Sequence, residues 1–271
     1  MTIEQIIGEG STAQIIVFNE NTVAKQFFEH VSDSSIENEY VKSKAVMECG
    51  LQVPAIFKKV KLNGTTALLY EKINGFPLTK KISKQPWTTF NLINQMVKLQ
   101  VLMHDNEISE FPQQKDILKQ KINLANELTS EEKRFITEML SKLPSGNSLC
   151  HGDFHPDNIL YDERGPIIID WADATQGNRL ADLARTLVIL RYGGLPPEMK
   201  PFKSKAVLYV RNLLAGQYIR SYKRSFDFPM DSLKKWILPV AAARLNENIP
   251  VLEKENLVLL VKQYIKNKGL K

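Results

Sequence analysis

Residues 151–158 read His-Gly-Asp-Phe-His-Pro-Asp-Asn, and they say more about the fold than any other stretch of this 271-residue sequence. Asn158 follows Asp153 by five positions, and an apolar run at 167–169 leads directly into Asp170. In phosphoryl-transfer loops with this spacing, the first Asp takes the acceptor hydroxyl, while the Asn and a later Asp hold Mg²⁺. The spacing therefore predicts a phosphoryl-transfer site in which Asn158 and Asp170 offer the hard oxygen ligands that Mg²⁺ prefers.

Two other interpretations of the same residues have to be weighed. His151, Asp153 and His155 alternate in the manner of metal ligands, as in a metal-dependent hydrolase, and a plain turn rich in hydrogen-bonding side chains is also open. The remaining histidines, His30 and His104, lie in no second ligand-like cluster of the sequence. A G-x-x-x-x-G-K-[ST] phosphate loop and a G-x-S-x-G nucleophile elbow are both missing from the sequence. Phosphoryl transfer is therefore the favoured interpretation.

Composition bounds the partners and the compartment. A net charge of +6 could indicate a nucleic-acid partner, but the lysines are scattered among acidic residues, as on a solvated surface. Cys49 and Cys150 are too few for a disulfide framework, and no basic segment followed by an apolar one opens the chain. No apolar run approaches the roughly 20 residues that span a membrane. We expect a soluble cytoplasmic protein with neither a nucleic acid nor a membrane as its partner.

The first 73 residues are expected to form antiparallel strands around one helix. The expected strands lie at 14–18, 23–28, 55–62 and 65–71, the last two joined by Asn63-Gly64, a strong two-residue hairpin signal. The helix is expected at 35–49, with Ser34 as its N-cap, Glu37 completing a capping box and Gly50 at its end.

The hydrophobic period becomes helical after Asn-Gly-Phe-Pro at 74–77. Helices are expected at 87–104, 114–128, 130–142, 180–191, 204–223, 231–245 and 252–266, and a β-hairpin at 159–161 and 166–170. The pattern predicts an α+β fold with a lobe at 1–73 and a larger, mainly helical lobe at 74–271.

Residues 8–13, Gly-Glu-Gly-Ser-Thr-Ala, form the first glycine-rich segment. Glycines let backbone N–H groups approach phosphate oxygens closely. The segment also fits a dinucleotide pattern, but that fold requires a helix next, whereas 14–18 is strand-like. A simple hairpin turn remains the other interpretation.

Lys25 lies within an apolar strand pattern, and two roles are open to it. It is either an edge-strand lysine facing water or an ammonium group aimed at nucleotide phosphates and positioned by a helix carboxylate. Glu39, fourteen residues further on, is the favoured partner because Glu37 is assigned to capping. Asp182 likewise has two compatible interpretations: favourable charge at a helix N-terminus, or a buried carboxylate that accepts hydrogen bonds from the catalytic-loop backbone.

Together these residues resemble the aminoglycoside phosphotransferase and choline kinase-like family, distant relatives of the protein kinases. The matching segments are Gly8 to Ala13, Lys25, Glu39, Val53-Pro54, 68–71, 151–158, 169–171 and 182–185, which together cover roughly residues 1–190. The resemblance implies a protein-kinase-like bilobal fold, ATP or GTP as co-substrate, Mg²⁺, and a small acceptor that carries a hydroxyl group. It also implies nucleotide binding in the first lobe, at 1–73, and catalysis and substrate binding in the second, at 74–271.

The same resemblance implies a role for each candidate residue. Asp153 orients or deprotonates the acceptor hydroxyl, and Asn158 and Asp170 hold Mg²⁺. The nucleotide is contacted by Gly8, Gly10, Ser11, Lys25 with Glu39, and the backbone between Glu71 and Ile73. His151, His155 and Asp182 support the catalytic loop, while Arg244 and Glu247 are candidate substrate contacts whose alternative is plain surface charge.

Two departures separate the chain from protein kinases. Gly152 stands where they carry Arg, and Ala172 stands where they carry Gly. Only eleven residues separate Asp170 from Asp182, which leaves no activation segment. The sequence thus predicts a Mg²⁺-dependent small-molecule kinase related to aminoglycoside phosphotransferases. Choline, sugar and macrolide acceptors remain open, and so does a non-catalytic nucleotide-binding scaffold.

Overall fold

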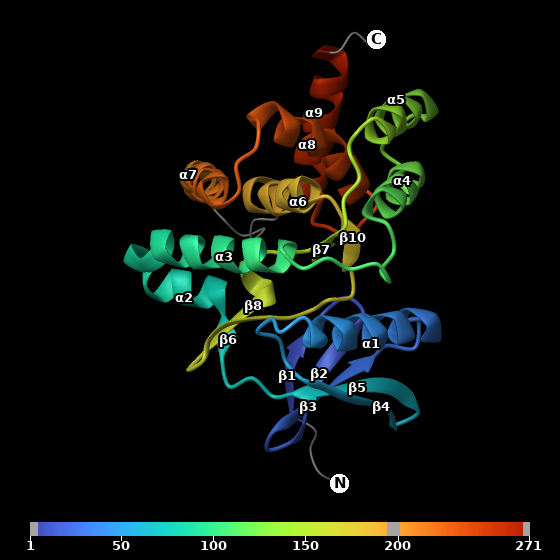
Figure 1. Cartoon of the computed structure of the whole chain (residues 1–271), viewed down its shortest axis with the longest axis vertical. Helices are drawn as coiled ribbons and strands as arrows, with labels where there is room; N and C mark the ends of the chain where they lie inside the picture. Colours follow the sequence, from blue (N-terminus) through green and yellow to red (C-terminus); the bar gives the residue numbers. More distant parts are fainter. Residues whose placement is uncertain (1–4, 194–200, 268–271) are drawn as a thin grey trace. The chain divides into compact units, whose positions relative to one another are not determined.

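The computed structural model describes residues 5–193 and 201–267 (Figure 1). The chain forms two compact units: Met1–Trp87 with Pro156–Ala174, and Thr88–His155 with Thr175–Lys271. A five-stranded antiparallel sheet in the first unit and a mainly helical second unit confirm the predicted kinase-like α+β fold. The predicted lobe boundary between residues 73 and 74 stays a prediction.

The sheet of the first unit has the strand order β1-β2-β3-β5-β4. Its strands are β1 (Ile6–Glu9), β2 (Ala13–Asn19), β3 (Thr22–Phe27), β4 (Ile56–Leu62) and β5 (Thr65–Glu71). The predicted hairpin turn between β4 and β5 is confirmed, because Asn63 and Gly64 have φ values of 49° and 85°. A two-residue type I′ turn needs positive φ at both of its central residues.

Helix α1 (Asp33–Glu48) covers one face of this sheet (Figure 1). Ile36 of α1 packs in a buried cluster with Ala13, Phe27, Ile56 and Leu68 from four strands. The opposite face is formed by a smaller cluster that contains Ala24, Ala67 and Leu69. Successive side chains of β3 and β5 point to opposite faces, so both faces of the sheet carry buried apolar side chains.

The predicted start of this helix at residue 35 is wrong. Ser32, not Ser34, is the N-cap: its backbone is extended, and its hydroxyl accepts the Ser35 N–H at 3.2 Å. This start places Asp33 in the first turn, where a negative charge is favourable. Glu37 pairs with Lys59 rather than closing a capping box. At the other end the helix stops before Gly50, whose φ of 71° suits a C-terminal glycine, as predicted.

The first unit also contains a three-stranded sheet in the order β6-β8-β9. It is built from β6 (Phe76–Pro77), β8 (Ile159–Asp162) and β9 (Gly165–Ile168), with the short helix α2 (Leu78–Lys84) and the 3₁₀ turn Pro156–Asn158 beside it. The predicted hairpin is confirmed, but β9 ends at Ile168, two residues before Asp170. Gly75 is required here, because a Cβ would lie 2.7 Å from the Tyr161 carbonyl oxygen.

The second unit consists of helices around one short strand pair. Its helices are α3 (Thr89–His104), α4 (Gln114–Leu124), α5 (Ser130–Ser141), α6 (Arg179–Tyr192), α7 (Pro201–Ser225), α8 (Met230–Arg244) and α9 (Val251–Asn267), and its strands are β7 (Ser148–Cys150) and β10 (Thr175–Gly177). All seven predicted helices are present. The part of α4 predicted beyond Leu124 is wrong, because Ala125 is extended and buried, so packing of the connecting segment ends the helix. No helix in the described ranges is both long enough and apolar enough to cross a bilayer.

Candidate active site

Lys25 forms ion pairs with two carboxylates of the first unit, Glu39 and Asp170. The lysine lies in the middle of β3, which is bonded to β2 on one side and to β5 on the other. Its Nζ donates to Glu39 Oε1 at 2.7 Å and to Asp170 Oδ1 at 3.0 Å. The interpretation of Lys25 as an edge-strand lysine is therefore wrong. Strand β3 thus carries the ammonium group, and helix α1 and the segment after β9 each carry one of the carboxylates that bind it.

The environment of Lys25 keeps it charged and fixed. Burial alone would lower its pKa, but the carboxylates of Asp170 and Glu39 outweigh burial and hold the pKa above its ordinary value. Glu39 Oε1 also accepts from the Tyr70 hydroxyl at 3.2 Å, and that hydroxyl lies 3.0 Å from Ser43 Oγ. A buried carboxylate with two donors is held in one orientation, so the ammonium group it binds is held as well.

Asp170 has a backbone conformation that is unusual for a residue with a side chain. Its φ is 63°, in the left-handed region, which costs about 1–3 kcal/mol and persists only where surrounding structure imposes it. The neighbouring Ile169 N–H donates to the Asn158 carbonyl oxygen at 3.0 Å, which ties the two predicted metal ligands to one framework. The Asp170 carboxylate is 47% exposed. A carboxylate and an amide oxygen are hard donors, and this pair suits Mg²⁺.

The glycine-rich segment forms the turn between β1 and β2. The Gly10 N–H donates to the Ala13 carbonyl oxygen at 2.9 Å, and Gly10 and Ser11 are exposed at its tip. Because strand β2 follows rather than a helix, the dinucleotide interpretation is wrong. Gly8 lies in β1, where it pairs with Ile15 of β2. Since the Gly10 N–H is already bonded, an anion at this tip would be met by the exposed backbone that follows it, at Ser11 and Thr12.

Glu71 and Ile73, predicted to lie near a nucleobase, differ in what they can offer. The Glu71 carboxylate accepts from the Ala55 N–H at 3.1 Å and from Arg164 Nη1 at 2.7 Å, and its own N–H donates to the Ala55 carbonyl. Ile73 follows β5 in an irregular segment. The Glu71 side chain therefore connects the end of β5 to Ala55 and Arg164. The Glu71 N–H is also bonded, so the predicted contact of this segment with a nucleobase would fall to the backbone of Ile73.

In the second unit, both oxygens of Asp153 are held by cationic partners or a ring nitrogen. Oδ1 accepts from Arg185 Nη2 at 3.0 Å, Oδ2 lies 3.2 Å from His155 Nε2, and Arg244 Nη1 is 3.9 Å away. Burial would raise the pKa of Asp153, but the His155 hydrogen bond and the Arg185 charge hold it well below its ordinary range. Such a carboxylate is a weak proton acceptor. It is, however, a well-oriented hydrogen-bond acceptor.

His151 and His155 have different surroundings. His151 is fully buried, its Nδ1 accepts the Asp153 N–H at 3.2 Å, and its ring packs edge-on to Phe154. His155 instead faces the Asp153 carboxylate. Across residues 5–193 and 201–267, the one group of three potential metal ligands is elsewhere, at His104, Cys150 and Asp182. The structure thus gives no support to a hydrolytic metal site in the loop.

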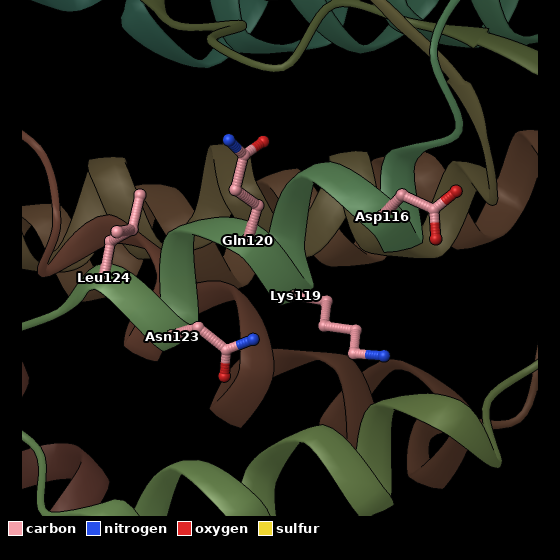
Figure 2. A pocket seen from close by; sticks show the side chains of 5 residues that line it. All are labelled: Asp116, Lys119, Gln120, Asn123 and Leu124. Atoms are coloured by element: carbon pink, nitrogen blue, oxygen red, sulfur yellow. The ribbon is translucent and has the colours of Figure 1, made fainter.

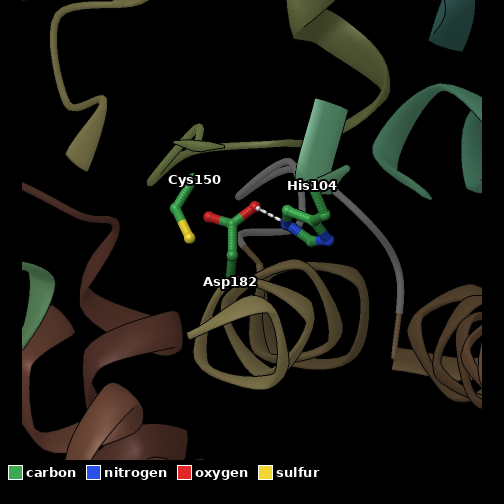
Figure 3. Close-up of side chains that lie close together, drawn as sticks. All are labelled: His104, Cys150 and Asp182. Atoms are coloured by element: carbon green, nitrogen blue, oxygen red, sulfur yellow. Dashed lines mark hydrogen bonds and ion pairs between the residues drawn. The ribbon is translucent and has the colours of Figure 1, made fainter. Parts of the chain in front are cut away.

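His104, Cys150 and Asp182 lie close together in the interior of the second unit, and the first and last of them are hydrogen-bonded (Figure 3). All three residues are buried, and His104 Nε2 lies 3.0 Å from Asp182 Oδ2. Burial raises the pKa of the Cys150 thiol well above its ordinary value.

Asp182 is the common acceptor of a buried polar network that joins three helices. The network has two side chains four residues apart on each helix: Gln100 and His104 on α3, Asp182 and Thr186 on α6, Tyr218 and Tyr222 on α7. Tyr218 donates to Gln100 Oε1 at 2.7 Å, and Gln100 Nε2 donates to Asp182 at 3.1 Å. The Tyr222 hydroxyl lies 2.6 Å from His104 Nδ1, on the far side of the ring from Asp182.

The network ends on the loop formed by residues 151–158. Asp182 Oδ1 accepts the Gly152 N–H at 2.8 Å, and Gly152 has a φ of 81°. Burial would raise the pKa of Asp182, but the His104 hydrogen bond and the Gly152 N–H lower it below its ordinary range. Asp182 is thus a buried carboxylate bonded to the loop backbone, which is the second of its two predicted roles. Gln100, Thr186, Tyr218 and Tyr222 were not identified from the sequence.

Arg185 lies in the matching segment 182–185, but no role is assigned to it from the sequence. Its Nη1 and Nη2 bind Glu247 at 2.9 and 2.7 Å while Nη2 also binds Asp153. It follows Asp182 by three positions on α6, and this spacing places both side chains on one helix face. That spacing was the signal that could have identified it.

Arg244 and Glu247, predicted as substrate contacts, join the same cluster. Arg244 Nη1 binds Glu247 at 3.0 Å, its Nε binds the buried Glu253, and Lys121 binds Glu247 at 3.0 Å. Neither is a plain surface charge. The structure places both beside Arg185 and hence next to Asp153.

An open depression lies along one face of α4 and belongs to no part of this site (Figure 2). It is lined by Asp116, Lys119, Gln120, Asn123 and Leu124, which are spaced three and four apart on the helix. None of the candidate site residues lines it.

Comparison with known proteins shows where this architecture recurs. A family model described as the phosphotransferase enzyme family matches residues 5–208, three quarters of the chain. A search of curated proteins found no match.

Solved structures with the same fold include three phosphotransferases. An aminoglycoside phosphotransferase APH(4)-Ia variant with AMP-PNP and hygromycin B superimposes with a TM-score of 0.67 at 13% identity, covering 100% of this chain and 95% of that one. The amicoumacin kinase hAmiN gives 0.64 at 13% identity, covering 98% and 88%. ADP-bound APH(2'')-Ib gives 0.60 at 17% identity, covering 96% and 91%. At such low identities these likenesses show the fold alone.

Proposed function

The chain belongs to the phosphotransferase enzyme family, and we propose that it is a Mg²⁺-dependent small-molecule kinase moving the γ-phosphoryl group of ATP or GTP onto a hydroxyl. The observation that carries the proposal is Lys25, held on an interior strand between Glu39 and Asp170 at 2.7 and 3.0 Å. A kinase needs one fixed cation beside a carboxylate that can hold a metal ion. The similar structures with bound AMP-PNP or ADP support a nucleotide co-substrate.

The first unit supplies the nucleotide-binding groups of this proposal. Lys25 contacts phosphate oxygens while Glu39 keeps its ammonium group in place. Gly8 and Gly10 shape the turn, and its exposed backbone at Ser11 faces the phosphates. Asn158 and Asp170 hold Mg²⁺, which, when bound, neutralises negative charge on the phosphates. Such a site works mainly through positioning and charge, so it needs no unusual proton chemistry.

The second unit supplies the carboxylate for the acceptor. Asp153 is ionised at neutral pH and has its two oxygens directed by Arg185 and His155. It accepts a hydrogen bond from the acceptor hydroxyl and so fixes the attacking oxygen, which is the contribution of orientation to such reactions. The low pKa favours orienting the hydroxyl over removing its proton. Asn158 follows Asp153 by five positions, so the chain itself limits their separation to about 18 Å.

A cytoplasmic location is part of the same proposal, because that is where ATP and GTP are available. The two cysteines are free, as a reducing compartment would keep them.

The test is a phosphotransfer screen of the purified protein with ATP or GTP against aminoglycosides, macrolides, choline, sugars and amino alcohols, each with Mg²⁺ and with EDTA. We expect Mg²⁺-dependent transfer to at least one class. Asp153→Ala should lower kcat by about 10³-fold or more while nucleotide affinity stays within about threefold. The matched control is Asp231→Ala, the same change at an exposed aspartate of α8.

Retention of wild-type turnover by Asp153→Ala would remove its assigned role. Saturable nucleotide binding without transfer to any acceptor would instead support a non-catalytic scaffold.

A further inference from the structure

Asp153 lies beside two permanent cations and one imidazole nitrogen. Arg185 lies 3.0 Å and Arg244 3.9 Å from its Oδ1, on helices α6 and α8, and His155 lies 3.2 Å from its other oxygen. The two guanidinium groups belong to side chains that are about 90% buried, at 9 and 10% exposure. They cannot swing out into solvent when a ligand arrives, because each is also bonded to a buried or half-buried glutamate.

The two glutamates next to Arg185 and Arg244 do not make the region negatively charged. Glu247 is shared by Arg185, Arg244 and Lys121, and Glu253 is bonded to Arg244. Three carboxylates (Asp153, Glu247 and Glu253) thus face three permanent cations (Arg185, Arg244 and Lys121), and the charge of a fourth, Arg211, interacts with Glu253. These groups carry no net negative charge, and every carboxylate among them already has a cationic partner.

This balance bears on the acceptor. A polycationic acceptor needs unpaired carboxylates to receive its ammonium groups, and an ammonium beside the reacting hydroxyl would approach two fixed guanidinium groups within a few ångströms. Like charges at that separation repel strongly where water is excluded. A hydroxyl with no positive charge beside it meets no such barrier.

We infer that the acceptor carries no cationic group beside the hydroxyl that is phosphorylated, so that it is a neutral or anionic hydroxyl compound rather than a polyamine aminoglycoside. Arg185 and Arg244 are the residues that set this preference. The inference rests on the proposed kinase function of the same site.

The first test compares acceptors matched in size and hydroxyl content but different in charge. Neutral disaccharides and sugar acids are set against kanamycin and neomycin, with either nucleotide and Mg²⁺. We expect kcat/KM for the best non-cationic acceptor to exceed that for each aminoglycoside by about 100-fold or more. An aminoglycoside with the highest kcat/KM of the panel would overturn the inference.

The second test shifts the charge of the cluster. Arg244→Gln leaves Glu247 and Glu253 with one cation fewer, so kanamycin affinity should rise about tenfold and fall again in 0.5 M salt, where charges are screened within a few ångströms. The control is Lys254→Gln, the same charge change at a pair with Glu127, which should leave kanamycin affinity unchanged. Lys121→Gln removes another partner of Glu247 from a more exposed position and serves if Arg244→Gln does not fold. Unchanged kanamycin affinity in the folded variants would contradict the assignment.

Equilibrium titration with kanamycin separates this inference from the proposed function. Failure of phosphotransfer to every acceptor would refute the kinase proposal alone. Kanamycin binding at micromolar concentrations to the wild-type protein would overturn the charge argument whether or not transfer occurs, and binding weaker than about millimolar would support it.

Discussion

Replacing Asp182 by Asn tests the idea that a buried network holds the catalytic loop. The substitution keeps the shape of the side chain but exchanges one carboxylate oxygen for an NH₂ group. Asp182 now accepts from Gly152, Gln100 and His104 at 2.8, 3.1 and 3.0 Å. Whichever way the amide is turned, its NH₂ faces a donor that then has no acceptor.

The cost can be worked from these contacts. One orphaned buried donor costs about 1–3 kcal/mol, and the remaining bonds lose charge assistance worth about 1 kcal/mol each. Relief from burying a carboxylate offsets part of this sum. We expect a loss of about 3 kcal/mol in the free energy of unfolding, in the range of about 3–5 kcal/mol seen when a buried charge pair is broken. At about 2–4 °C per kcal/mol, the melting temperature should fall by roughly 6–12 °C.

Urea and thermal unfolding would measure this, with Asp231→Asn as the control because that aspartate is exposed and bonded only to Lys234 one turn away. In folded Asp182→Asn protein, kcat should fall by about tenfold or more with little change in nucleotide KM, since the lost contact supports the loop that carries Asp153. A loss below about 1 kcal/mol, equal to that of the control, would refute the reasoning.

Four further outcomes are expected. Asp170→Ala should weaken Mg²⁺-nucleotide binding by about tenfold or more in a titration, and unchanged affinity would remove its metal role. Lys25→Met should raise the nucleotide KM and also destabilise the first unit by about 3 kcal/mol in urea unfolding, because Glu39 is left buried without its cation; equal stability would contradict that pairing. Arg185→Lys should lower kcat by about 10-fold or more in steady-state assays, since an ammonium cannot bind Asp153 and Glu247 together. The pKa values of Asp153 and Asp182 lie below the ordinary value near 4, so their stabilisation is complete above about pH 4 and is lost as the pH falls through those lowered values; acid unfolding curves should therefore be flatter for Asp182→Asn than for the wild type.

The sequence predicted the elements whose structure depends mainly on neighbouring residues in the chain. Asn63-Gly64 has one favoured turn type, and the apolar run before Asp170 has room for only a short strand. Glu39 was chosen over Glu37 for Lys25 by a wrong argument about capping, yet the pairing is present at 2.7 Å. The position of Glu39 on the helix explains why it pairs with Lys25. Glu39 lies on the buried face of α1, whereas Glu37 is exposed and bonds Lys59.

What the sequence could not predict depends on contacts between distant segments. Gln100 on α3 and Tyr218 and Tyr222 on α7 look like polar positions on two unrelated helices, and only folding brings them to the network around Asp182 on α6. The cap at Ser32 was missed because Ser32, Ser34 and Ser35 are equivalent candidates in sequence. Strand β6, of two residues, and α2, of seven, are too short to leave a periodic pattern.

The central claim is that the chain moves a phosphoryl group from a nucleoside triphosphate to a hydroxyl. Phosphorus NMR of a reaction containing the wild-type protein, ATP or GTP, Mg²⁺ and the best acceptor tests it most directly. The account predicts a new phosphate monoester on the acceptor, formed in step with the nucleoside diphosphate and missing with Asp153→Ala. Nucleotide consumption that yields only inorganic phosphate, or a monoester formed equally well by Asp153→Ala, would contradict it.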